Sequence, residues 1–128
     1  MEFTLSTTIN ASAIDLFDGW LTSKVHAEMT GGSAEISKEV NRPFKAWDEY
    51  ISGKNLEIKP NYIKQTWRTS DFEKDQEDSI IEIYFEENKA GKTKITLHHT
   101  NLLDKDLHYK RGWMEHYFEP MKEYFEKK

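Results

Sequence analysis

The chain has 128 residues, a net charge of −5 and a mean hydropathy of −0.83, and 13% of its residues are aromatic. This length suits one domain over residues 1–128 with a single core, and the lack of cysteine excludes disulfides and thiolate metal sites. The acidic balance argues against nucleic acid as a partner, and the absence of a signal-peptide pattern or a membrane-length apolar run predicts a soluble, cytoplasmic protein.

The first predicted elements are a strand and two short helices. Apolar and polar residues alternate from Phe3 to Ile9, as in a half-buried strand. Ser12, followed three residues later by Asp15, resembles a helix-capping signal and predicts a first helix that ends near Trp20. A second short helix is expected over residues 24–29, before a pair of glycines. The expected apolar face of the first helix consists of Ile14, Phe17, Trp20 and Leu21.

The middle of the chain predicts about six antiparallel strands joined by turns. In the second of these strands, Phe44, Ala46 and Asp48 are expected to share one face. A β-bulge is expected at Ser52-Gly53, because a glycine inside a strand often marks one. Residues 70–78 are expected to form a loop. The strands are expected near residues 34–36, 44–48, 50–58, 63–69, 79–86 and 93–99.

A long amphipathic helix is predicted from about Leu107 to Glu126. At ~1.5 Å per residue it is roughly 30 Å long, so it needs a broad apolar surface to lie on. Pro120 interrupts it, and either the helix kinks over residues 116–120 or its backbone is re-satisfied locally. The apolar stripe consists of Met114, Tyr117, Phe118, Met121 and Phe125, widened by Trp113 and Tyr124.

Together these elements predict an α+β helix-grip fold. In this arrangement a curved antiparallel sheet of about six to seven strands packs around the long C-terminal helix, and two short helices follow the first strand. The curvature of such a sheet can leave a cavity between the sheet and the helix.

The five histidines are the first candidates for metal or acid–base chemistry. His98 and His99 are adjacent on a predicted strand and therefore point to opposite faces. His108 and His116 lie about 12 Å apart along a helix at ~1.5 Å per residue, which is too far for a shared metal ion. The sequence also lacks a Gly-x-Ser-x-Gly motif and a glycine-rich phosphate loop. We therefore predict no metal site, no cofactor and no catalytic residue.

Large apolar residues that should converge between the helix and the sheet are the remaining candidates. If a cavity is present, they line it and hold a small hydrophobic or amphipathic ligand, with Gln65, His99, Trp113 and Tyr117 as polar contacts. The alternative is that they only fill the core and that His99 is a hydrogen-bonded structural histidine. The candidate ligand-cavity residues are Phe17, Trp20, Phe44, Gln65, Trp67, Ile83, Phe85, Leu97, His99, Trp113, Tyr117 and Met121.

Acidic residues are concentrated between Asp71 and Lys89, where eight carboxylates accompany two lysines. One interpretation is a solvated hairpin tip. The other is a docking surface for a basic partner.

Several short stretches, in order along nearly the whole chain, match a known family. They are Asp15-Leu16-Phe17, Gly31-Gly32, Phe44, Ile51-Ser52-Gly53, Ile63-Lys64-Gln65-Thr66-Trp67-Arg68, Thr93, Arg111-Gly112-Trp113 and Tyr117-Phe118. In their order and spacing the chain resembles the C-terminal domain of the activator of heat-shock protein 90 ATPase, within the START-like (Bet v 1-like) superfamily. The resemblance implies a helix-grip fold with a hydrophobic cavity, and a role in ligand binding or chaperone assistance. Family members often have a tryptophan after the first helices, where this chain has His26-Ala27-Glu28-Met29.

Three functions remain open at this point. The first is a non-catalytic module, a monomer or weak dimer, that holds a small hydrophobic or amphipathic ligand between the sheet and the C-terminal helix. The second is a co-chaperone-like protein that acts on a chaperone ATPase through an exposed surface. The third is a polyketide-cyclase-like enzyme that works mainly by positioning its substrate and depends on His99.

Overall fold

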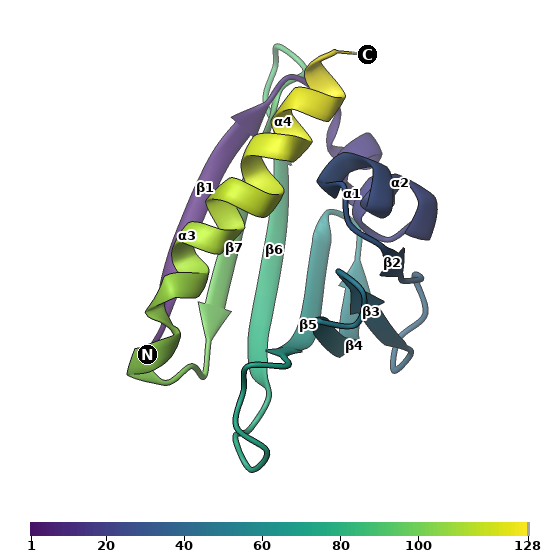
Figure 1. Ribbon diagram of the computed structural model, residues 1–128. Coiled ribbons are helices and arrows are strands. Elements are labelled where there is room, and N and C mark those ends of the chain that lie inside the picture. Colours follow the sequence, from purple (N-terminus) through teal and green to yellow (C-terminus); the bar gives the residue numbers. More distant parts are fainter. Residues whose placement is uncertain (128) are drawn as a thin grey trace.

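The computed structural model describes residues 1–127. Within them, seven antiparallel strands form a curved sheet in the order β1-β7-β6-β5-β4-β3-β2, and a long C-terminal helix lies across it (Figure 1). The predicted α+β helix-grip fold is therefore confirmed. The elements before that helix are β1 (Phe3–Ile9), α1 (Ala13–Trp20), α2 (Ser23–Thr30), β2 (Ala34–Glu35), β3 (Pro43–Ala46), β4 (Ile51–Lys59), β5 (Tyr62–Thr69), β6 (Ser79–Glu87) and β7 (Thr93–Thr100).

The C-terminal helix is continuous, but its winding changes along its length. The Glu119 N–H bonds to the Met114 carbonyl oxygen, five residues back, which makes the turn before Pro120 π-helical. Pro120 is placed in the first turn of the segment that follows, where its missing N–H disturbs little. The backbone is thus re-satisfied locally. The four segments are a 3-10 turn (Asp104–His108), α3 (Tyr109–Trp113), the π turn (Met114–Phe118) and α4 (Glu119–Glu126).

The side chains that the C-terminal helix buries match the predicted stripe in part. Tyr117 and Phe118, in the π turn, are both buried, as the predicted stripe requires. Met114 and Phe125, which the spacing placed in the apolar stripe, are only partly buried. Tyr109, outside the predicted stripe, is buried at 7% exposure.

The buried face of the first helix is shifted from the predicted one, although Trp20 and Leu21 are buried as expected. Ser12 accepts the hydrogen bond from the Asp15 N–H at 3.2 Å, so the predicted cap is present. Ile14, however, is 63% exposed, and Leu16 is fully buried in its place. Trp20 belongs both to the apolar stripe with Ile14 and to the one with Leu16. The spacing of apolar residues therefore does not decide which stripe is buried. The packing of α1 against α2 and β6 selects the stripe with Leu16.

The expected bulge in β4 lies elsewhere in that strand. The register with β5 shifts between Asn55 and Glu57, and Ser52 keeps its regular partner, Arg68. The glycine at position 53 has a different explanation, because a Cβ there would collide with the Thr66 carbonyl oxygen. Its absence lets β4 and β5 approach closely.

Asn55 fastens the loop between β2 and β3 to the sheet. Its side chain is fully buried and donates to the carbonyl oxygens of Ser37 at 2.8 Å and Glu39 at 2.9 Å. Its Oδ1 accepts from Gln65 Nε2 at 2.9 Å. One buried side chain therefore bonds to a buried amide on β5 and to two carbonyl oxygens of the loop.

We expect Asn55→Ala to lower the free energy of unfolding by about 2–4 kcal/mol, because the buried Gln65 amide loses its partner and the loop loses its two bonds to the sheet. Urea denaturation at neutral pH measures the change. Asn10→Ala, at an exposed position, is the control and should change stability by less than about 0.5 kcal/mol. Equal effects of the two substitutions would contradict this account of Asn55.

Candidate functional site

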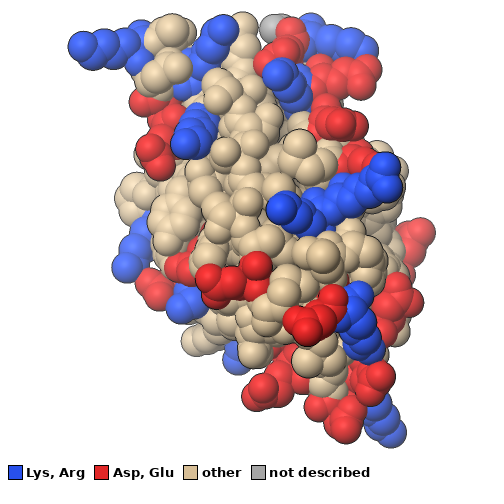
Figure 2. All heavy atoms as spheres, turned by 90° about the vertical axis from the view of Figure 1, so that its left-hand side faces the viewer, with Lys and Arg blue, Asp and Glu red and all other residues tan. Residues whose placement is uncertain are grey.

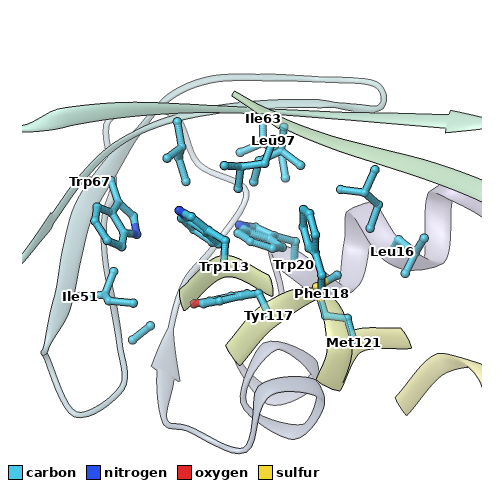
Figure 3. Packing of buried hydrophobic residues seen from close by; sticks show 14 of the residues in the cluster. Leu16, Trp20, Ile51, Ile63, Trp67, Leu97, Trp113, Tyr117, Phe118 and Met121 are labelled. Carbon is cyan, nitrogen blue, oxygen red and sulfur yellow. The ribbon is translucent and has the colours of Figure 1, made fainter. Parts of the chain in front are cut away.

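Trp113 in α3 is the centre of an aromatic cluster between the helix and the sheet. The centroid of its ring lies 6.1 Å from that of Trp20, 5.5 Å from that of Trp67 and 4.8 Å from that of Tyr117. Figure 3 shows these rings gathered below the strands of the sheet. Offset and tilted ring pairs contribute about 0.5–1.5 kcal/mol each beyond the area they bury. The cluster therefore fixes the helix against the sheet.

His99 in β7 connects the cluster to the sheet through buried hydrogen bonds. Trp113 Nε1–H donates to His99 Nδ1 at 3.0 Å. Because Nδ1 accepts, the neutral ring carries its proton on Nε2 and donates to Ser79 Oγ at 2.8 Å, and that hydroxyl donates to the Trp67 carbonyl oxygen at 2.6 Å. Burial, with a smaller contribution from the neighbouring His98, lowers the pKa of His99 to about 3. His99 is thus a neutral group with both ring nitrogens occupied.

His26 in α2 makes a matching connection between the C-terminal helix and the two short helices. His26 Nδ1–H donates to the Trp20 carbonyl oxygen at 2.8 Å, and Nε2 accepts from the Tyr117 hydroxyl at 3.0 Å. Burial lowers the pKa of His26 to about 4, although the bond to Trp20 opposes this. Burial also raises the pKa of the Tyr117 hydroxyl. No sequence pattern indicated His26, because Tyr117 lies 91 residues away.

A pocket of about 300 Å³ opens beside the cluster, between the C-terminal helix on one side and the turn after β3 with strands β4 and β5 on the other. Its inner end is apolar, and Figure 3 shows Ile51 and Trp67 on one side facing Trp113 and Tyr117 on the other. All four side chains are buried. The mouth of the pocket is bordered by exposed polar and charged side chains, namely Tyr50, His108, Arg111, Glu115 and His116.

Trp47 covers one side of the mouth from a strained turn. Trp47, Asp48 and Glu49 have φ angles of +55°, +54° and +70°, a left-handed conformation that costs roughly 1–2 kcal/mol per residue. The Trp47 N–H bonds to the Ser33 carbonyl oxygen at 2.8 Å, and the Asp48 N–H bonds to the Ser33 hydroxyl oxygen at 2.7 Å. Asp48 does not share a face with Phe44 and Ala46 as expected, because the chain already reverses at this turn. Strained backbone of this kind is concentrated at functional sites.

Two glycines shape the pocket in different ways. A Cβ on Gly32 would lie 2.5 Å from the Trp47 ring, so glycine lets the indole lie directly on the backbone. Gly112 lies in α3 on the pocket wall, and a Cβ there would meet no atom within 4 Å. A glycine inside a helix costs about 1 kcal/mol relative to alanine. At Gly112 the missing side chain avoids no steric clash, but it leaves the pocket open.

The structure brings three of the predicted ligand-cavity residues to this pocket: Trp67, Trp113 and Tyr117. The other nine lie in or against the core around it, covered by neighbouring side chains. They are Phe17, Trp20, Phe44, Gln65, Ile83, Phe85, Leu97, His99 and Met121.

Most of the pocket wall was missed from the sequence. Tyr109, Trp113 and Tyr117 are spaced four residues apart, so a stripe extended toward the start of the helix would have included Tyr109. Trp47 gave no signal, because only the left-handed turn brings its ring to the pocket. The other missed residues are Tyr50, Ile51, His108, Arg111, Gly112, Glu115 and His116.

The five histidines are spread over α2, β7 and the C-terminal helix. Within residues 1–127, no three His, Asp or Glu side chains are placed to hold a metal ion together. Nor does this part of the chain contain a helix with the length and apolarity needed to cross a membrane.

The curved sheet, the long helix across it and the pocket between them define a START-like (Bet v 1-like) helix-grip protein. A family model described as "Activator of Hsp90 ATPase homolog 1-like protein" matches residues 10–126. The chain belongs to this family, as the sequence resemblance indicated. Among curated proteins, none matches the sequence.

Several solved structures share the fold at low sequence identity. An HSP90 activator from Plasmodium falciparum is 22% identical with a TM-score of 0.82, over 93% of this chain and 91% of that one. The Aha1 dimer from Colwellia psychrerythraea is 12% identical with a TM-score of 0.79, over 98% and 96% of the two chains. Ara h 8.0201 is 15% identical with a TM-score of 0.73, over 100% and 99%. These similarities support the architecture, and the site must be argued from this chain's own residues.

The two buried histidines predict how stability depends on pH. Their pKa values are lowered in the folded protein, to about 3 for His99 and about 4 for His26, from an unfolded value near 6.5. Their contribution to the free energy of unfolding is therefore complete above pH 6.5. It is lost as the pH falls from 6.5 toward 4 for His26 and toward 3 for His99. We expect each histidine to remove about 2 kcal/mol of unfolding free energy between pH 7 and pH 5.

Urea denaturation at the two pH values measures this loss. His26→Gln and His99→Gln should each reduce the difference between pH 7 and pH 5 by about 2 kcal/mol, whatever they do to stability at pH 7. If both variants keep the full dependence of the natural protein, the two rings are not held neutral by burial.

Proposed function

We propose that this protein is a non-catalytic module that binds a small amphipathic molecule in the pocket between its sheet and its C-terminal helix. The observation that carries the proposal is a pocket of about 300 Å³, the lower end of the range for ligand sites, walled largely by aromatic rings. His99, on which an enzymatic role would depend, has both nitrogens occupied by internal partners, and this favours binding over catalysis. The cysteine-free chain fits a cytoplasmic site of action, which is part of the proposal.

The two ends of the pocket differ in polarity, and this supports an amphipathic ligand. The inner end is walled by Ile51 and by the rings of Trp67, Trp113 and Tyr117. At the mouth, Arg111 Nε donates to Glu115 at 2.8 Å, while the Arg111 side chain remains 85% exposed. Its remaining N–H groups can therefore meet a polar or anionic group on the ligand. The apolar body of the ligand would lie inside and its head at the mouth.

Gly112 allows a test in which loss of binding cannot result from loss of stability. Gly112→Ala and Gly112→Leu should both stabilise the helix by about 0.5–1 kcal/mol, because the backbone there is unstrained and the space is empty. The leucine side chain, however, should enter the pocket. We expect Gly112→Leu to weaken binding on the order of tenfold or more, equivalent to about 1.4 kcal/mol, and Gly112→Ala to change it much less.

The probes are two dyes that differ by one charged group, 1-anilinonaphthalene-8-sulfonate and neutral N-phenyl-1-naphthylamine. Fluorescence titration of each dye against the two Gly112 variants measures the effect of filling the pocket. Arg111→Gln should weaken binding of the sulfonate dye about two- to fivefold and leave the neutral dye unchanged. The pocket is not the binding site if Gly112→Leu binds both dyes as tightly as the natural protein.

A second candidate function is a co-chaperone-like role on a chaperone ATPase, favoured by the family and by the loop over residues 70–78. Arg68 holds this loop by donating to Asp78 at 2.7 Å and to the Gln76 and Glu73 carbonyl oxygens at 3.1 Å. Asp75 and Glu77 are exposed at its tip. Figure 2 shows acidic side chains around the lower end of the molecule, where this loop lies in Figure 1. The loop is thus an ordered acidic surface that suits a basic partner.

If this surface binds the chaperone, Asp75→Lys combined with Glu77→Lys should sharply reduce retention on immobilised heat-shock protein 90 from the same cell. Asp78 is left unchanged because it pairs with Arg68. Asp15→Lys combined with Glu119→Lys makes the same change of charge at exposed positions outside the loop and should have less effect. A natural protein that is not retained at all would exclude this function.

A further inference from the structure

Strand β1 lies at an edge of the sheet and has β7 as its neighbour on one side only (Figure 1). The direction of its backbone groups follows from the pairing of the neighbouring strands. The Asn88 N–H bonds to the Lys92 carbonyl oxygen, which shows that even-numbered residues exchange the hydrogen bonds between β6 and β7. The odd-numbered residues of β7 therefore exchange theirs with the odd-numbered residues of β1.

The even-numbered residues Thr4, Ser6 and Thr8 consequently direct their N–H and C=O groups away from the sheet. Just beyond the strand, the Asn10 N–H bonds to Glu126 Oε2 of the C-terminal helix at 3.1 Å. The edge thus presents one donor and one acceptor on each of three residues.

Nothing along β1 protects this edge from another strand. The segment Phe3–Ile9 contains no charged residue and no proline, and its register with β7 runs without a bulge. Charges, prolines and bulges are the usual protection of edge strands, as is a short length. The opposite edge, β2, is protected by its length of two residues. Figure 2 looks onto the side where β1 lies and shows a band of uncharged surface down its upper half, between charged side chains on either side.

We propose that β1 pairs antiparallel with β1 of a second copy of this chain, with the two-fold axis at Ser6. Thr4-Leu5-Ser6-Thr7-Thr8 is symmetric in its outward residues, which read Thr, Ser, Thr in both directions. This register places Thr4 opposite Thr8 of the other copy and Ser6 opposite its own equivalent. All three outward donors and all three acceptors of each edge are then satisfied.

The side chains of the edge suit this register. Threonine and serine pairs across a strand are favourable, and no like charges meet between Thr4 and Thr8. The Glu126 carboxylate accepts the hydrogen bond of the Asn10 N–H. The row of hydrogen bonds between the two copies therefore ends at Thr8. The sheet of one copy would continue into the sheet of the other, and the pocket, on the side of β4 and β5, would stay open.

Amide exchange at two concentrations tests the pairing directly. In a sample at about 1 mM, where weak association is still populated, the N–H groups of Thr4, Ser6 and Thr8 should exchange more slowly than in a dilute sample. The N–H groups of Leu5 and Thr7, already bonded to β7, should exchange at the same rate in both. Ser6→Pro removes one outward donor without touching the β7 ladder, so by light scattering it should be monomeric at both concentrations.

Because the natural chain contains no cysteine, single substitutions can also test the register by cross-linking. Paired residues have Cα atoms about 5.5 Å apart, within reach of a disulfide. Mild oxidation should link Ser6→Cys into a dimer, whereas Thr8→Cys alone should stay monomeric. A mixture of Thr4→Cys and Thr8→Cys should form the mixed dimer.

Three results would each overturn the proposal. The first is a natural protein that stays monomeric at about 1 mM with freely exchanging Thr4, Ser6 and Thr8 amides. The second is equal cross-linking of Ser6→Cys and Thr8→Cys, which would indicate random collision. The third is a Ser6→Pro variant that keeps the dimeric mass, which would place the interface elsewhere.

Discussion

The hydrogen bond from the Trp113 indole to His99 is the contact on which the rest of the structure depends. It fixes the C-terminal helix to β7, and the bonds from His99 through Ser79 to the Trp67 carbonyl oxygen extend the connection to β5. One turn further along, Tyr117 is bonded to His26 and so to the two short helices. Both histidines are buried and neutral, so each donates at one ring nitrogen and accepts at the other. The aromatic rings between them can then take only one arrangement.

Three features of the backbone around the pocket are locally unfavourable. A glycine within α3, three consecutive left-handed residues ending β3 and a π turn in the long helix all depart from the most stable local choice. Each of them lies at or next to the pocket. A sequence selected only for stability would have no reason to place them together, and such departures are expected where a protein binds or reacts.

The pocket and the edge of β1 lie at different parts of the same sheet. The pocket is bordered by the turn after β3, by β4 and β5 and by residues 108–117 of the C-terminal helix, while the open edge belongs to the first strand. Binding in the pocket and pairing at the edge therefore need no common residue. The family and the solved structures at 12–22% identity establish the helix-grip architecture, which hosts many activities, so the function rests on these local features.

The sequence by itself determined the order of elements, the approximate ranges of the long strands, the capped first helix and the membership of the family. The elements depend on local spacing, which 2.0- and 3.6-residue periods reveal directly, and the family follows from short motifs in a fixed order. It did not determine the face of α1, where two stripes shared Trp20, or the position of the bulge in β4. The tertiary structure alone decided which aromatic residues fill the core and which border the pocket, because that depends on contacts such as His26 with Tyr117, 91 residues apart, and on a left-handed turn at Trp47 that no periodicity encodes.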